Sequence, residues 1–286
     1  MLISRLPTNP IIHRDLFAPG DPDGANINGP CLVRVPAWVA NPLGRYYCYF
    51  AHHQGISIRL AYADTLAGPW QLHPGGVFSL ADIPAAHGHI ASPDVIWDDA
   101  AQECRLYLHG PARAVPGQQR FLVCGGDGLH FPVVGSEPLT PSYLRVWRHD
   151  GWWYGMVKGG RLYRSRDGRT DFIKGHNPFS LPPESEAGTK LAGIRHLAIV
   201  PGPDAIPIYW SSIGDTPPNA SCVPAWIFAG SGPPGRPGRL TKCCARNCRG
   251  KDPISPWSPR VPGRCITLNM PSGIRISSPI TMGGSG

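Results

Sequence analysis

Short apolar runs, each about five to eight residues long and bounded by Gly, Asp or Pro, follow one another through the first 216 residues. Examples are "CLVRVPAW" (31–38), "RYYCYFAHH" (45–53) and "ISIRLAYAD" (56–64). Runs of this kind are typical of strands and hairpins, and no long stretch has clean helical periodicity. We therefore predict an all-β fold, which 35 Gly, 34 Pro and nine Trp also favour.

The predicted strands recur in units of roughly fifty to sixty residues, the spacing of propeller blades. The third strand of each unit ends in a similar way, in "AYADTLAGPW", "VCGGDGLHF" and "YRSRDGRTDF". In the last two, Asp-Gly predicts a hairpin turn with positive φ at both central residues, and the aromatic that follows is expected to pack between blades. The units begin near Asn28, Ser92, Tyr143 and Arg195, and the fourth stops at "SSIGDTPP".

The composition changes abruptly after Thr216. From Pro217 to the end there are nine Lys or Arg and one acid, Asp252, whereas residues 1–216 hold 18 basic and 18 acidic residues. The whole net charge of +8 therefore lies in the last 70 residues. We predict an incomplete propeller over residues 1–216, comprising blades one to three and part of a fourth, and a non-native disordered tail over residues 217–286.

The tail contains "TKCCARNCRGKD" (241–252), which has three cysteines in six residues. A zinc site requires two pairs of Cys or His at suitable spacing, and this segment has no second pair. A basic nucleic-acid arm would have a similar composition, but this one lacks interleaved aromatic residues. The third hypothesis is a change of reading frame.

That hypothesis can be tested by shifting the reading frame, so that the last base of each codon is read together with the first two bases of the next codon. Four outcomes do not depend on codon choice; for example, Cys243–Cys244 gives Leu and Met270–Pro271 gives Ala. With mostly G or C as third base, the tail can give a string that contains "RDPDLFADHDGR", a strand and turn where the next blade is due. We therefore expect a frameshift in the C-rich codons of Thr216, Pro217 and Pro218.

No apolar run has the length of a signal peptide or a membrane span, so we expect a cytoplasmic protein that binds neither membrane nor nucleic acid. The four cysteines of the first 216 residues are expected to be reduced core residues. They are Cys31, Cys48, Cys104 and Cys124.

Two segments, "NINGPCLVRVPAWVANPLGRYYCYFAHHQGISIRLAYADTLAGPW" (26–70) and "HIASPDVIWDD" (89–99), resemble five-bladed β-propellers of the glycoside hydrolase family 43 and 32 superfamily. The likeness is closest to uncharacterised bacterial members. It implies a fifth blade, whose "RDP" exists only in the other frame. It also implies a central funnel that binds a carbohydrate and hydrolyses glycosidic bonds with carboxylates.

Carried over by position, the resemblance assigns funnel residues at the start of each blade. Asp94 is the one plausible funnel carboxylate, and His89 is the best-placed general acid because the pKa of histidine lies near neutrality. The substrate-binding candidates are Asn28, His52, His53, Arg145, Arg195 and His196. Each has a structural alternative: a turn residue for Asp94 and Asn28, a satisfied polar group for the histidines, and an ion pair for the arginines.

The departures from the family pattern leave two functions open. Blade one has "NGP" where the hydrolases carry Asp-Pro, and blade four has Arg-His without a clear catalytic Glu. We expect a glycosidase-like propeller that is inactive in this truncated form, with a non-catalytic carbohydrate-binding propeller as the alternative. No cofactor and no metal ligands are predicted; a divalent ion in the funnel is compatible with the sequence, but no ligand cluster demands one. The sequence leaves the oligomeric state undefined.

Overall fold

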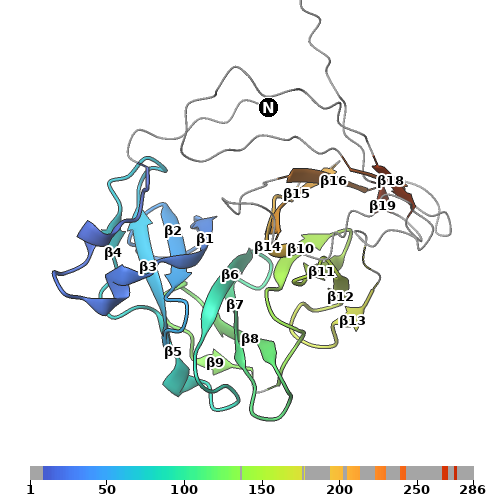
Figure 1. The fold of residues 1–286 in the computed structure, drawn as a ribbon. Helices are drawn as coiled ribbons and strands as arrows, with labels where there is room; N and C mark the ends of the chain where they lie inside the picture. The colour runs from blue at the N-terminus through green and yellow to red at the C-terminus, as the bar shows by residue number, and fades with distance from the viewer. Residues whose placement is uncertain are drawn as a thin grey trace, which may run out of the picture. The chain divides into compact units, whose positions relative to one another are not determined.

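The computed structural model describes residues 9–135, 137–175, 177, 194–201 and 205–212, and four later strand segments, 223–229, 239–242, 266–269 and 274–275. These residues form four antiparallel sheets (Figure 1), and their only helical turns are short 3-10 segments, at Arg14–Leu16, Pro22–Ala25 and Leu80–Asp82. The all-β prediction is confirmed. The chain divides into two compact units, Met1–Leu144 and Arg145–Gly286. This division falls inside the predicted propeller domain, and the boundary at residue 216 stays a prediction.

The first unit contains two sheets in which successive strands pair in chain order. The first sheet consists of β1 (Asn28–Arg34), β2 (Tyr46–Ala51), β3 (Ser57–Ala63) and β4 (Gln71–Leu72), and β5 (Phe78–Ser79) also pairs with β3. The second consists of β6 (Ala91–Asp98), β7 (Glu103–Pro111), β8 (Gln118–Gly125) and β9 (Val133–Val134). β1 begins at the predicted blade start Asn28, and β6 begins one residue before the predicted start Ser92.

The central strands β2, β3, β7 and β8 are buried along most of their length, including a few polar residues such as Arg59 and Arg120. Tyr47, Tyr49, Leu60, Leu106 and Phe121 are all fully buried, and they belong to one hydrophobic cluster to which both sheets contribute. Phe131, the aromatic that follows the "CGGDG" turn, joins this cluster, as predicted. Trp70, its counterpart in blade one, packs instead in a second cluster with Ile12 and Phe17 from before β1.

The second unit contains the other two sheets, described here separately from the first unit. One sheet consists of β10 (Arg145–His149), β11 (Trp152–Met156), β12 (Leu162–Ser165) and β13 (Ile173–Lys174). The other consists of β14 (Ile194–Ile199), β15 (Ala205–Ser212), β16 (Val223–Ala229), β17 (Arg239–Lys242) and β18 (Ile266–Asn269), with β19 (Ile274–Arg275) paired to β16.

Strands β16 to β19 are the only described residues between positions 217 and 286. The cysteine cluster of residues 243–248 and the codons at which we expect the frame to change lie outside the described residues. The non-native character of this segment therefore stays a prediction, as does the count of five blades.

The Asp-Gly turns differ in detail from the prediction. Gly128 and Gly168 have φ of +75° and +69°, but neither Asp127 nor Asp167 is among the residues with positive φ. Each Asp instead accepts hydrogen bonds from the two backbone N–H groups that follow the glycine, at 2.8–2.9 Å. The carboxylate accepts the backbone hydrogen bonds of the turn in this way, so the Asp itself needs no positive φ.

Two expectations from composition can be compared with the described residues. Cys31, Cys48, Cys104 and Cys124 are free, and all except the half-buried Cys31 are buried, as predicted. Among the described helices, none is long and apolar enough to cross a membrane.

Candidate functional site

In three of the sheets, a residue with left-handed backbone conformation lies at or next to the start of the first strand. Gly29 in β1 has φ of +57°, Ser92 in β6 has +45°, and Tyr143, two residues before β10, has +64°. In β1 and β6 this residue precedes a proline and lies in a break of the ladder. Asn28 pairs with Ala51 and Cys31 with Tyr49, while Ala91 pairs with His109 and Asp94 with Tyr107. One extra residue on the inner strand is a β-bulge, a feature common beside binding sites.

The first two bulges lie against each other. A Cβ atom at Gly29 would come within 2.9 Å of both Cα and Oγ of Ser92. The left-handed φ and this close approach together require glycine at position 29. The "NGP" motif therefore shapes the backbone beside a site.

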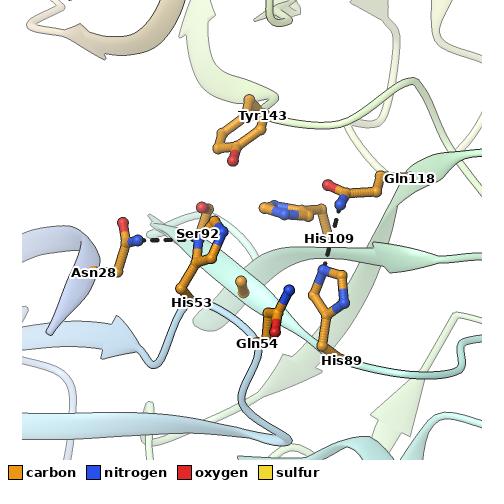
Figure 2. Close-up of a pocket in the computed structure, with 9 residues that line it drawn as sticks. Asn28, His53, Gln54, His89, Ser92, His109, Gln118 and Tyr143 are labelled. Carbon is orange, nitrogen blue, oxygen red and sulfur yellow. Dashed lines mark hydrogen bonds between the residues drawn. The ribbon is translucent and has the colours of Figure 1, made fainter. Parts of the chain in front are cut away.

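Figure 2 shows the site, which we call the histidine pocket. Its polar side chains come from strand ends and adjoining turns of the first unit, and they are Asn28, His53, Gln54, His89, Ser92, His109, Gln118 and Tyr143, with Ala91 completing the wall. Its water-accessible volume is about 60 Å³. A cavity needs at least about 10–15 Å³ of this volume to hold one water, so the pocket has room for a small polar group.

The side chains of the histidine pocket hold one another through ring contacts and hydrogen bonds (Figure 2). The amide nitrogen of Gln118 lies 3.4 Å from Nε2 of His89, and that of Asn28 lies 3.3 Å from Nδ1 of His53. The His109 ring is 2% exposed and contacts the Tyr143 ring at 4.6 Å between centroids. The pocket is thus partly preformed before any ligand arrives.

The electrostatics of the histidine pocket are set by imidazoles and by one arginine behind its wall. Burial lowers the pKa of His89, and the nearby His53 and His87 lower it further. Arg120 is fully buried, and its guanidinium donates to the carbonyls of Ser92 and Leu144 at 2.7 and 2.6 Å. Among the described residues that line the pocket, none carries a carboxylate.

Three of the predicted site residues, Asn28, His53 and His89, lie together in the histidine pocket. Their backbones come from the start of β1, the turn after β2 and the segment before β6. Their roles as ligand contacts stay predictions.

Asp94 and His52 do not line the histidine pocket. Asp94 is 8% exposed within β6, and its Oδ1 lies 3.9 Å from Sγ of Cys31. The matching bulges make Cys31 the counterpart of Asp94 in β1. The role of Asp94 as a funnel carboxylate stays a prediction. His52 accepts a hydrogen bond from the backbone N–H of Gln54 at 3.3 Å.

The other predicted substrate-binding residues belong to the second unit. Arg145 Nε donates to the carbonyl of Leu197 at 2.9 Å, which ties β10 to β14. His196 is half-buried in β14 opposite Ser211. The backbone of Arg195 is part of β14, and its side chain is outside the described part of the structure.

Five polar lining residues were not predicted as ligand contacts: Gln54, Ser92, His109, Gln118 and Tyr143. Ser92 and Tyr143 had a signal, because both were predicted as blade starts. No sequence signal marked His109 and Gln118. They lie in β7 and β8, and only the pairing of these strands with their neighbours brings them to the site. Among the described residues, no three His, Cys, Asp or Glu are grouped to hold a metal ion.

Comparison with known proteins gives one relative and a group of solved structures. The chain is 31% identical over 241 residues to "Uncharacterized protein R118" of Acanthamoeba polyphaga mimivirus, an alignment that covers 76% of this chain and 67% of that protein. No family model matches.

The similar solved structures are family 43 glycoside hydrolases. One is the GH43_1 enzyme from Xanthomonas citri complexed with xylose, at 14% identity and a TM-score of 0.52, covering 71% of this chain and 70% of that one. Another is an α-L-arabinofuranosidase from Clostridium thermocellum, at 17% identity and a TM-score of 0.50, covering 71% and 69%. This likeness shows that the chain has their propeller-type fold.

Proposed function

Since this chain belongs to the protein family of uncharacterized protein R118 from Acanthamoeba polyphaga mimivirus, we propose a function from its own pocket: it binds one unit of a carbohydrate in the histidine pocket and does not hydrolyse it. The observation that carries the proposal is the lining of that pocket. Amide, hydroxyl and imidazole groups surround a small cavity, and no carboxylate joins them among the described residues.

Sugar binding is supported by the chemistry of the lining groups. Sugar hydroxyls both donate and accept hydrogen bonds, as do Asn28, Gln54, Gln118, Ser92 and Tyr143. Similar folds bind sugars, since the Xanthomonas citri enzyme was solved with xylose and with xylotriose.

The proposal that the pocket does not hydrolyse its ligand rests on where the acidic residues lie. Glycoside hydrolysis needs two carboxyl groups on either side of the scissile bond, about 5 to 9.5 Å apart. The described wall of the histidine pocket has none, and the one predicted acid, Asp94, lies buried beyond the bulge.

Titration calorimetry with xylose and xylotriose tests this proposal. We expect saturable binding that weakens at least about tenfold in His109→Ala and Asn28→Ala, because each loses a lining group. His13→Ala, far from the pocket in sequence and not among its lining residues, serves as the control. Binding that is absent, or equal in all four proteins, would overturn the proposal.

A second candidate, glycoside hydrolysis with Asp94 and His89 as catalytic groups, is supported by the fold of family 43 hydrolases. It applies to a chain whose remaining blades, including a fifth, are restored. Turnover of an aryl glycoside by the restored chain, lost in Asp94→Asn while sugar binding persists, would favour it.

We also infer that the segment after Thr216 is read out of frame. The net charge confined to it and the blade-like string in the alternate frame support this inference. Resequencing the codons of Ile213 to Cys222 tests it: one missing or two extra bases support it, and an unchanged frame overturns it.

The remaining expectations belong to the same proposal. We propose a cytoplasmic protein whose partner is a carbohydrate and which binds neither nucleic acid nor membrane, because the part of the chain before Pro217 has no excess of basic residues. Membership of the bacterial branch of the superfamily is likewise a proposal, since the relative found is viral.

A further inference from the structure

The groups of the histidine pocket that can gain charge near neutral pH are the imidazoles of His53, His89 and His109. The Tyr143 phenol is neutral in this range. The described lining has no carboxylate with which to accept hydrogen bonds from sugar hydroxyls. It offers amide N–H donors in Asn28, Gln54 and Gln118 instead.

A fourth cationic group lies directly behind the wall. The Arg120 guanidinium donates to the carbonyl of Ser92, whose own residue lines the pocket. Low-dielectric surroundings screen this charge less than water does. Its field therefore reaches the pocket and favours a negative group there.

We propose that the sugar taken by the histidine pocket is acidic, and that its carboxylate binds beside His89, His109 and Gln118. This inference rests on the proposed carbohydrate binding and names the class of sugar. A uronic acid is such a sugar. A phosphorylated sugar fits less well, because a phosphate carries nearly two negative charges and no Lys or Arg lines the described pocket to balance them.

The proposal fixes the direction of the pH dependence. Burial keeps the pKa of His89 below its ordinary value, and so do His53 from the β2 turn and His87. The His109 ring on β7 lies 6.2 Å from the His89 ring, and Arg120 on β8 donates to the carbonyl of the lining residue Ser92. A bound carboxylate favours imidazolium, so uronate affinity rises as the pH falls from 8 to 5.5, and binding takes up protons.

The experiment titrates the 286-residue chain with three matched sugars, galacturonate, galactose and galactose 6-phosphate, at pH 5.5 and 8. We expect galacturonate to bind about tenfold more tightly than galactose at pH 5.5, the gain of charge-assisted over neutral hydrogen bonds. We expect that preference to shrink at pH 8. Proton uptake is read from the heat of binding in buffers of different ionisation enthalpy.

Two variants and a control locate the effect. His89→Gln keeps a polar side chain but cannot become cationic, so it lowers the galacturonate-to-galactose preference at pH 5.5; His53→Gln provides a second, independent test. His87→Gln, an exposed histidine outside the lining, keeps most of the preference.

Each other outcome contradicts a different statement. Galactose binding as tightly as galacturonate at pH 5.5 overturns the acidic-sugar inference and leaves carbohydrate binding intact. Tighter binding of the phosphate overturns the carboxylate assignment. No binding of any of the three sugars overturns both the inference and the proposed function.

Discussion

Arg120 shows at the residue scale how a buried charge shapes the site. Its guanidinium donates hydrogen bonds to the carbonyls of Ser92 and Leu144. Ser92 is itself left-handed, and Leu144 follows the left-handed Tyr143. Left-handed backbone costs on the order of 1–3 kcal/mol in a residue other than glycine and persists only when its surroundings hold it. Arg120 is therefore a positioning residue for Ser92 and Tyr143.

We predict that Arg120→Met lowers the free energy of unfolding by about 3 kcal/mol, because two hydrogen bonds from a charged donor are lost in the core. Sugar affinity should fall as well. Urea unfolding and a sugar titration measure the two effects. Arg113→Met is the matched control, since Arg113 is exposed and also donates to a carbonyl, that of Pro84. Equal losses in both variants would contradict the positioning role.

Asp167 gives a prediction with a defined pH range. Desolvation raises the pKa of its carboxyl, but hydrogen bonds from the backbone N–H groups of Thr170 and Arg169 and from the Ser165 and Thr170 hydroxyls outweigh this, and the pKa falls to about 2. A depressed pKa in the folded state stabilises the protein above the ordinary value of 3.8. That stability is lost as the pH falls toward 2.

We predict that Asp167→Asn lowers the free energy of unfolding by about 1 kcal/mol at pH 7, a figure that allows for solvent screening of an exposed group. The difference from the unmodified chain should vanish near pH 2. Asp64→Asn, in the corresponding turn of blade one, is the control, because Asp64 receives no hydrogen bond from the described residues. A pH-independent loss would show that the carboxylate does not act through its charge.

At the scale of elements, the turn after each third strand depends on its glycine. Gly128 has φ of +75°, and a Cβ there would lie 2.6 Å from the Tyr49 hydroxyl and 2.7 Å from the Trp97 ring. The Tyr49 hydroxyl also donates to the Gly128 carbonyl at 2.8 Å. The turn of the second sheet is thus locked onto residues of both sheets.

We predict that Gly128→Ala destabilises the chain by about 2–4 kcal/mol, the sum of backbone strain and overpacking. Gly117→Ala isolates the backbone part, because Gly117 has φ of +82° and open space where a Cβ would be. It should cost about 1 kcal/mol. Similar unfolding midpoints in urea for the two variants would contradict the packing contribution.

The elements were more predictable from sequence than the site. Short apolar runs bounded by turn residues mark the strands, so β1, β6, β10 and β14 begin within two residues of the predicted blade starts. His109 and Gln118 could not be predicted, because register alone brings β7 and β8 to β6. The bulge that displaces Asp94 from the pocket was also missed. Its only trace is a proline after the left-handed residue.

At the scale of the whole molecule, a propeller must close on itself to leave no exposed sheet edges. We predict that the chain as written unfolds at lower urea than one in which the frame is restored after Asp215. It should also aggregate more readily and lack hydrolytic activity. Parallel unfolding of the two chains is the measurement. The same midpoint and the same cooperativity in both would contradict the frameshift.

The most direct measurement follows xylotriose by ligand-observed NMR while it is mixed with the 286-residue chain. We predict that its signals show saturable binding, lost in His109→Ala, and that no xylose is released during the time course. Release of xylose by the chain would contradict a binding site without hydrolysis. Signals unchanged by the protein would contradict carbohydrate binding itself.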